Sequence, residues 1–166
     1  MNALVGAHTF LVNGLAAVAG AIFAGIAILI PAEVVLRALS LPSIYGSLDL
    51  VQYGLLAATF LAAPWVLMVD AHVSVDLLTM RLGPRWRPRV LQFTAAVGAV
   101  ASLVLLAVGI DAAVIAFDRG SAIRTAFVVP EWIALSVLPV SALLLAVEFV
   151  LKMTGLRPRG AARVDL

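Results

Sequence analysis

The sequence contains no cysteine, which excludes a disulfide framework, a thiolate metal site and a thiol redox pair. Charge is scarce as well, since only 12% of the 166 residues are charged while 64% are hydrophobic. A soluble domain carries about twice that charged fraction, because polar side chains must cover its surface. With a mean hydropathy of +1.15, the chain cannot be a soluble globular enzyme and is expected to be solvated by lipid.

Other signals of chemistry are missing too. The formal net charge is only +2 and the basic residues are dispersed, so nucleic acid is not an expected partner. No Gly-rich phosphate loop, nucleophile elbow or metalloprotease motif is present. His8 and His72 are the only histidines and both fall outside the expected spans, which argues against bis-histidine haem. We therefore expect a non-enzymatic chain with no catalytic residue, cofactor or metal.

Four charge-poor stretches are long enough to cross a bilayer, because a spanning helix needs about 20 apolar residues. In lipid every backbone polar group must be satisfied within the segment, so these stretches should be helices. The sequence thus predicts an all-α integral membrane protein with four transmembrane helices in a single domain, residues 1–152. The expected spans are about 10–36, 48–69, 89–117 and 127–151.

The basic residues favour one side of the membrane. With four spans, the N-terminus, the second connection and the C-terminus share a side, and that side carries all but three of the 11 Lys and Arg residues. The positive-inside rule therefore predicts that both termini are cytoplasmic, with residues 153–166 as a basic cytoplasmic tail. No Lys or Arg precedes Arg37, so the first run does not fit a cleaved signal peptide and is expected to remain as a helix.

The connection over residues 70–88 is too long for a turn and too polar to span. Its apolar spacing predicts a short interfacial helix over 70–82 that ends at Gly83-Pro84. His72 and Asp76 would share a face of this helix, a spacing that a metal could use. A local hydrogen bond on a polar stripe is the favoured interpretation, because no further ligands can be named.

Two carboxylates near span ends have a basic residue four positions later. Glu33 precedes Arg37, and Glu148 precedes Lys152. Residues four apart are neighbours on a helix, so we expect two local ion pairs.

Asp111 is the best candidate for a functional polar residue inside the membrane. Because it lies at the outer end of the third span, solvation or pairing with Arg119 or Arg124 is favoured over a role as coupling-ion ligand. No carboxylate lies in the middle of a span, so we do not expect the chain to transport a solute alone. Small residues on the first span, including Gly20, suggest contact with another protein.

Three stretches carry motifs in a recognisable order. They are Gly46-Ser47-Leu48-Asp49 with Tyr53 and residues 59–63; Asp70-Ala71-His72-Val73-Ser74-Val75-Asp76-Leu77-Leu78; and Val129-Pro130-Glu131-Trp132 with Leu138-Pro139-Val140-Ser141. In this order and spacing they resemble the small permease (DctQ-type) subunit of TRAP transporters, over about residues 10–152. The resemblance marks these family-motif candidates: Asp49, His72, Val75, Asp76, Leu77, Pro130, Trp132 and Pro139.

The resemblance implies a tripartite importer of the bacterial inner membrane, driven by an ion gradient, with sodium as the expected ion. An extracytoplasmic solute-binding protein would capture an organic acid, a large multi-span subunit would carry it by symport, and this chain would act as a scaffold. Three alternatives stay open: the small subunit of a tripartite tricarboxylate transporter, an autonomous four-span transporter, and an anchor for a redox or signalling complex. The signature over 72–78 favours the TRAP interpretation.

Overall fold

The computed structural model describes residues 2–69, 87–124 and 126–154. Within these ranges the chain forms four long helices: α1 (Asn2–Ala38), α2 (Ser47–Met68), α4 (Arg87–Asp118) and α5 (Glu131–Met153). Each helix is long and apolar enough to cross a membrane. The expected all-α membrane fold with four transmembrane helices is thereby confirmed.

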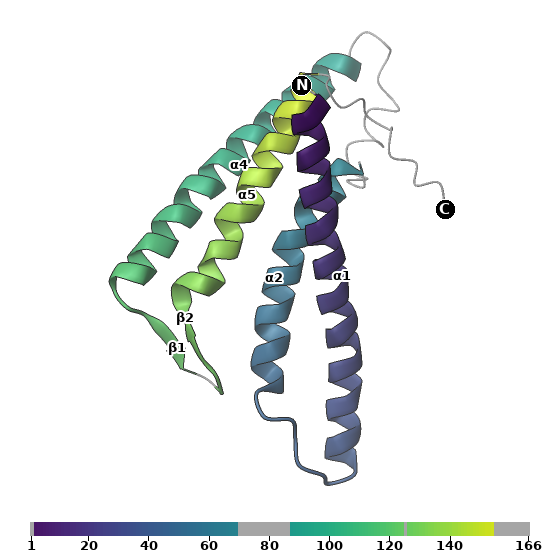
Figure 1. The fold of residues 1–166 in the computed structure, drawn as a ribbon, viewed down its shortest axis with the longest axis vertical. Coiled ribbons are helices and arrows are strands. Elements are labelled where there is room, and N and C mark those ends of the chain that lie inside the picture. The colour runs from purple at the N-terminus through teal and green to yellow at the C-terminus, as the bar shows by residue number, and fades with distance from the viewer. Residues whose placement is uncertain (1, 70–86, 125, 155–166) are drawn as a thin grey trace.

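The helices form two antiparallel pairs that are inclined to one another (Figure 1). α1 packs on α2, α4 packs on α5, and the contact between α2 and α5 joins the pairs. α1 and α4 therefore flank the bundle. The N-terminus and the end of α5 lie at one end of the bundle, and the α1–α2 connection lies at the opposite end (Figure 1).

The first helix is longer than expected, because it begins at Asn2 rather than near residue 10. Its 37 residues span about 55 Å at 1.5 Å per residue, well beyond the hydrocarbon thickness of about 30 Å. The expectation that His8 lies outside the first helix is therefore wrong. His8 lies within the apolar segment Val5–Ala38.

The connection between α4 and α5 forms an element that the sequence analysis missed. Strands β1 (Ala122–Arg124) and β2 (Val128–Pro130) pair as an antiparallel hairpin, with Ile123 opposite Val129. β-Branched side chains favour strands, and Pro130 holds the residue before it in the extended region. Consequently α5 begins at Glu131, not at residue 127 as expected.

Small residues let α4 approach α5 closely. Ala95, Ala99 and Ser102 are buried on the inner face of α4. A Cβ atom added at Gly98 would lie 2.4 Å from the Phe149 ring. The contact therefore depends on small side chains, as is usual for helices that associate in lipid.

The interfacial helix expected over 70–82 lies outside the described residues, as does most of the basic tail.

Candidate functional site

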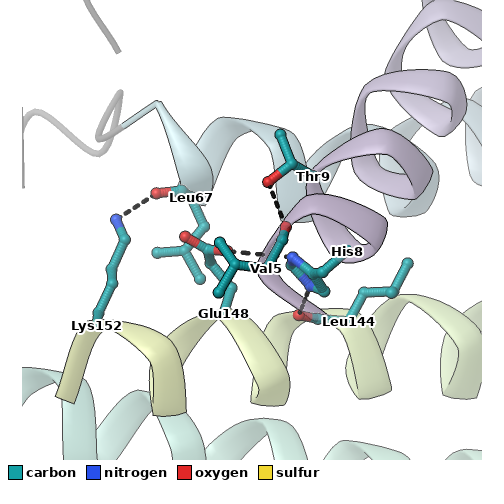
Figure 2. Close-up of polar contacts among 7 residues, drawn as sticks. All are labelled: Val5, His8, Thr9, Leu67, Leu144, Glu148 and Lys152. Atoms are coloured by element: carbon teal, nitrogen blue, oxygen red, sulfur yellow. Dashed lines mark hydrogen bonds and ion pairs between the residues drawn. The ribbon is translucent and has the colours of Figure 1, made fainter. Parts of the chain in front are cut away.

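Polar side chains of α1 and α5 and a backbone carbonyl of α2 lie close together at the end of the bundle that holds the N-terminus (Figures 1 and 2). His8 on α1 and Glu148 on α5 are 8% and 0% exposed. The Nδ1 atom of His8 lies 3.6 Å from Oε2 of Glu148, and its Nε2 atom lies 3.4 Å from the carbonyl oxygen of Leu144. Both nitrogens of the ring thus face oxygen atoms.

The geometry places a proton on the Nε2 atom of the imidazole ring. A backbone carbonyl only accepts hydrogen bonds, so Nε2 must carry a proton to bond to Leu144. If Nδ1 were unprotonated, its lone pair would point at the Glu148 carboxyl group. The distance from Nδ1 to Oε2 is too long for a hydrogen bond, and the contact is a buried ion pair when the ring carries protons on both nitrogens.

Lys152 lies one turn beyond Glu148 and contacts another helix. Its Nζ atom donates a hydrogen bond to the carbonyl oxygen of Leu67, in the last turn of α2 (Figure 2). The last carbonyls of a helix have no partner within the helix and carry partial negative charge, so a cation stabilises them. Through Glu148 and Lys152, α5 is thereby tied to both α1 and α2. We call His8, Glu148, Lys152 and the Leu67 carbonyl the inner joint.

The spacing of Glu148 and Lys152 predicts a local pair but gives no sign of their contacts to His8 and Leu67. Spacing within one helix reveals only local neighbours, whereas these contacts join distant segments. The one available signal was His8 itself, a polar residue close to a long apolar run.

A second polar contact joins α2 to α5 within the membrane-spanning part of the bundle. Pro64 lies inside α2 and has no N–H, so the carbonyl of Phe60 loses its usual helical partner. The Ser141 hydroxyl of α5 donates a hydrogen bond of 2.6 Å to this carbonyl. Because Ser141 is only 1% exposed, it satisfies a backbone group that water could not reach. We call this contact the middle joint.

The third joint lies at the opposite end and contains Asp49, one of the family-motif candidates. Asp49 Oδ2 accepts hydrogen bonds from the backbone N–H groups of Ala126 (2.8 Å) and Phe127 (3.3 Å). The Tyr45 hydroxyl donates to the Ala126 carbonyl at 2.8 Å, and its ring meets the Phe127 ring edge-on. Gly46 has φ 74, and a Cβ there would lie 2.2 Å from the Phe127 ring. These residues form the hairpin joint, which ties the start of α2 to the hairpin.

Glu33 anchors the α1–α2 connection at the same end. Its Oε1 atom accepts a 3.2 Å hydrogen bond from Arg37 Nε, which confirms the ion pair that the spacing predicted. Its Oε2 atom also accepts a 3.1 Å hydrogen bond from the backbone N–H of Ile44, a contact that the sequence analysis missed.

The remaining candidates are spread over the molecule. Pro130 precedes the first turn of α5, the Trp132 ring meets Phe117 edge-on, and Pro139 packs close to Gly109. His72, Val75, Asp76 and Leu77 lie outside the described residues.

Asp111 is exposed on α4 and makes no hydrogen bond or ion pair in the described part of the chain. Of the two partners expected for this carboxylate, Arg119 is not paired with it, and the side chain of Arg124 lies outside the described residues; the expected solvation stays a prediction.

No group of three metal-ligating side chains occurs among the residues that the structure describes. The polar groups of the three joints instead contact one another or the backbone across helices. Chemically, this arrangement can fix helices relative to each other.

Comparison with known proteins identifies the family of the chain. A family model described as "Tripartite ATP-independent periplasmic transporters, DctQ component" matches residues 26–158. No match was found among curated proteins or among solved structures. The matched range includes Asp49, the hairpin and Glu148, while His8 lies before it.

Proposed function

The chain belongs to the DctQ family and is a small membrane subunit of a TRAP transporter, and from this premise we propose that it acts as a non-enzymatic scaffold. The large multi-span subunit would carry the solute, and an extracytoplasmic solute-binding protein would deliver it. We infer that sodium drives the system and that its solutes are organic acids. Its place is then the bacterial inner membrane, with both termini cytoplasmic.

The observation that supports a scaffold is that the buried polar groups hold helices and connections together. His8, Asp49 and Ser141 each join one helix to another part of the bundle. Ser102 bonds back to the carbonyl of Gly98 in its own helix, and Glu33 holds a connection. A protein that moves a solute by itself needs polar groups that line a path and bind the solute. Groups already engaged in joints do not meet that need.

The alternative functions are less well supported. The family match favours a TRAP subunit over the small subunit of a tripartite tricarboxylate transporter. The engaged polar groups argue against an autonomous transporter. An anchor for a redox or signalling complex has no supporting feature in the described residues.

Reconstitution tests the scaffold proposal directly. The tagged chain should retain its cognate large subunit in detergent when the two are co-expressed. In liposomes, the pair together with the binding protein should take up an organic acid when a sodium gradient is imposed. The small chain alone should give no flux. Solute flux from the chain alone, or no association with the large subunit, would overturn the proposal.

A further inference from the structure

The outward side of α4 is an apolar face with one carboxylate within it, Asp111, and a second, Asp118, at its last residue. The inner side packs on α5 through buried small residues that include Ser102. Asp111 follows Ser102 by nine residues, about two and a half turns, and therefore lies on the opposite side of the helix. Residues at helical spacing continue this side, which we call the outward face: Phe93, Val97, Val100, Val104, Asp111 and Ile115.

Asp111 lies deeper in the membrane than the C-terminal end of α4. The Phe117–Trp132 ring pair lies near the hairpin end of α4 and α5, and tryptophan is enriched at membrane–water interfaces. Asp111 precedes Phe117 by six residues, which corresponds to about 9 Å along the helix axis. An aspartate side chain is too short to cover that distance, unlike a lysine or arginine that can reach the headgroups.

A carboxylate at this depth needs a polar partner, because lipid chains offer none. The chain's described residues provide no hydrogen bond or ion pair to it. A second copy of this chain could pack on the outward face through a two-fold axis along the membrane normal. The two Asp111 carboxylates would then lie side by side, and the repulsion between like charges disfavours that arrangement. The complementary partner is a helix that presents a cation.

We propose that the outward face of α4 is the docking surface for a transmembrane helix of the large transport subunit, which presents an Arg or Lys side chain to Asp111. This inference rests on the proposed function, because it assumes a large membrane partner. The exposed valines at 97, 100 and 104 supply the apolar contact, and the ion pair sets the register of the two helices.

The test uses the chain co-expressed with its cognate large subunit. The photo-crosslinker p-benzoylphenylalanine replaces Val104 on the outward face or, as a control, Leu143, which is 50% exposed on α5. We expect an adduct with the large subunit from position 104 and none from position 143. Asp111→Asn should lower the amount of large subunit retained in detergent by about tenfold or more, since one partner of a buried charge pair is removed.

Matched variants separate docking from folding. Asp118→Asn removes an exposed carboxylate from the same face but at the last residue of the helix, beyond the apolar contact, and should retain the large subunit fully. Asp111→Glu should restore most of the binding lost in Asp111→Asn. Because Asp111 is exposed, both position-111 variants should elute as the wild-type chain does when expressed without the partner.

The outcomes distinguish the two proposals. If the wild-type chain retains no large subunit, the proposed function fails. If it does retain the subunit but crosslinks only from position 143, or if Asp111→Asn binds as Asp118→Asn does, the docking surface is wrong and the proposed function stands. An adduct between two copies of this chain from position 104 would also overturn the docking surface.

Discussion

The ion pair between His8 and Glu148 should be energetically coupled, and a double-mutant cycle can measure that coupling. Two unit charges 3.6 Å apart attract by about 4–5 kcal/mol at an effective dielectric constant of about 20. This attraction is an upper bound, because coupling free energies between contacting residues are about 0.5–3 kcal/mol. We therefore expect a coupling free energy of about 2 kcal/mol.

The cycle consists of His8→Leu, Glu148→Leu and the double variant. Each single variant leaves one polar partner buried without the other, so each should lower the free energy of unfolding by about 3 kcal/mol. The double variant replaces the pair by two apolar side chains, and its loss should be smaller than the sum of the two single losses by about 2 kcal/mol.

Unfolding can be followed by titrating detergent-solubilised protein with sodium dodecyl sulfate and recording the fluorescence of the three tryptophans. Phe10→Leu is the control, because Phe10 lies on the same helix but is 81% exposed. Its effect should stay within about 0.5 kcal/mol. If the losses of the two single variants add to that of the double variant, the buried pair is not coupled and the account of the inner joint is wrong.

The same unfolding assay tests three further contacts. Ser141→Ala should lower the free energy of unfolding by about 1–2 kcal/mol, because the Phe60 carbonyl loses its donor. In a Pro64→Ala background, where the helical N–H is restored, the same substitution should lower it far less. Gly46→Ala should be destabilising by about 1–3 kcal/mol because of its φ of 74 and the Phe127 ring, whereas Gly120→Ala, with open space around it, should cost less. Gly98→Ala should cost about 1–3 kcal/mol by forcing Phe149 away, whereas Gly25→Ala meets nothing and should not destabilise. Equal losses within any matched pair would contradict the packing described.

The parts of the fold that follow from local sequence were predicted well. The four spans depend only on runs of about 20 apolar residues, and the Glu33–Arg37 pair depends only on the helical repeat. The hairpin was missed because its second strand, Val128–Pro130, is as apolar as the helix that follows it. Hydropathy alone does not distinguish a short apolar strand from the first turn of a span.

The joints could not be predicted, because their partners are far apart in the sequence and are often backbone groups. Asp49 was singled out as a motif residue, yet its partner is the N–H of Ala126, 77 positions later. Any residue except proline offers such an N–H, so no side-chain pattern marks the partner. The same holds for Ser141 and the Phe60 carbonyl, although Pro64 does indicate from sequence alone that a carbonyl four residues earlier needs a donor.

The placement of the three joints explains how four helices can form a rigid scaffold in lipid. Apolar side chains gain little by leaving lipid for one another, so the two helix pairs would be held together weakly by apolar contact alone. The inner, middle and hairpin joints connect the α1–α2 pair to α5 or its hairpin at both ends and between them. Hydrogen bonds at several levels resist sliding and rotation better than a single contact does. Such a bundle keeps the outer sides of α1 and α4 available for partners while its own helices stay fixed, so damage to a joint should reduce assembly with the large subunit before it alters solute affinity.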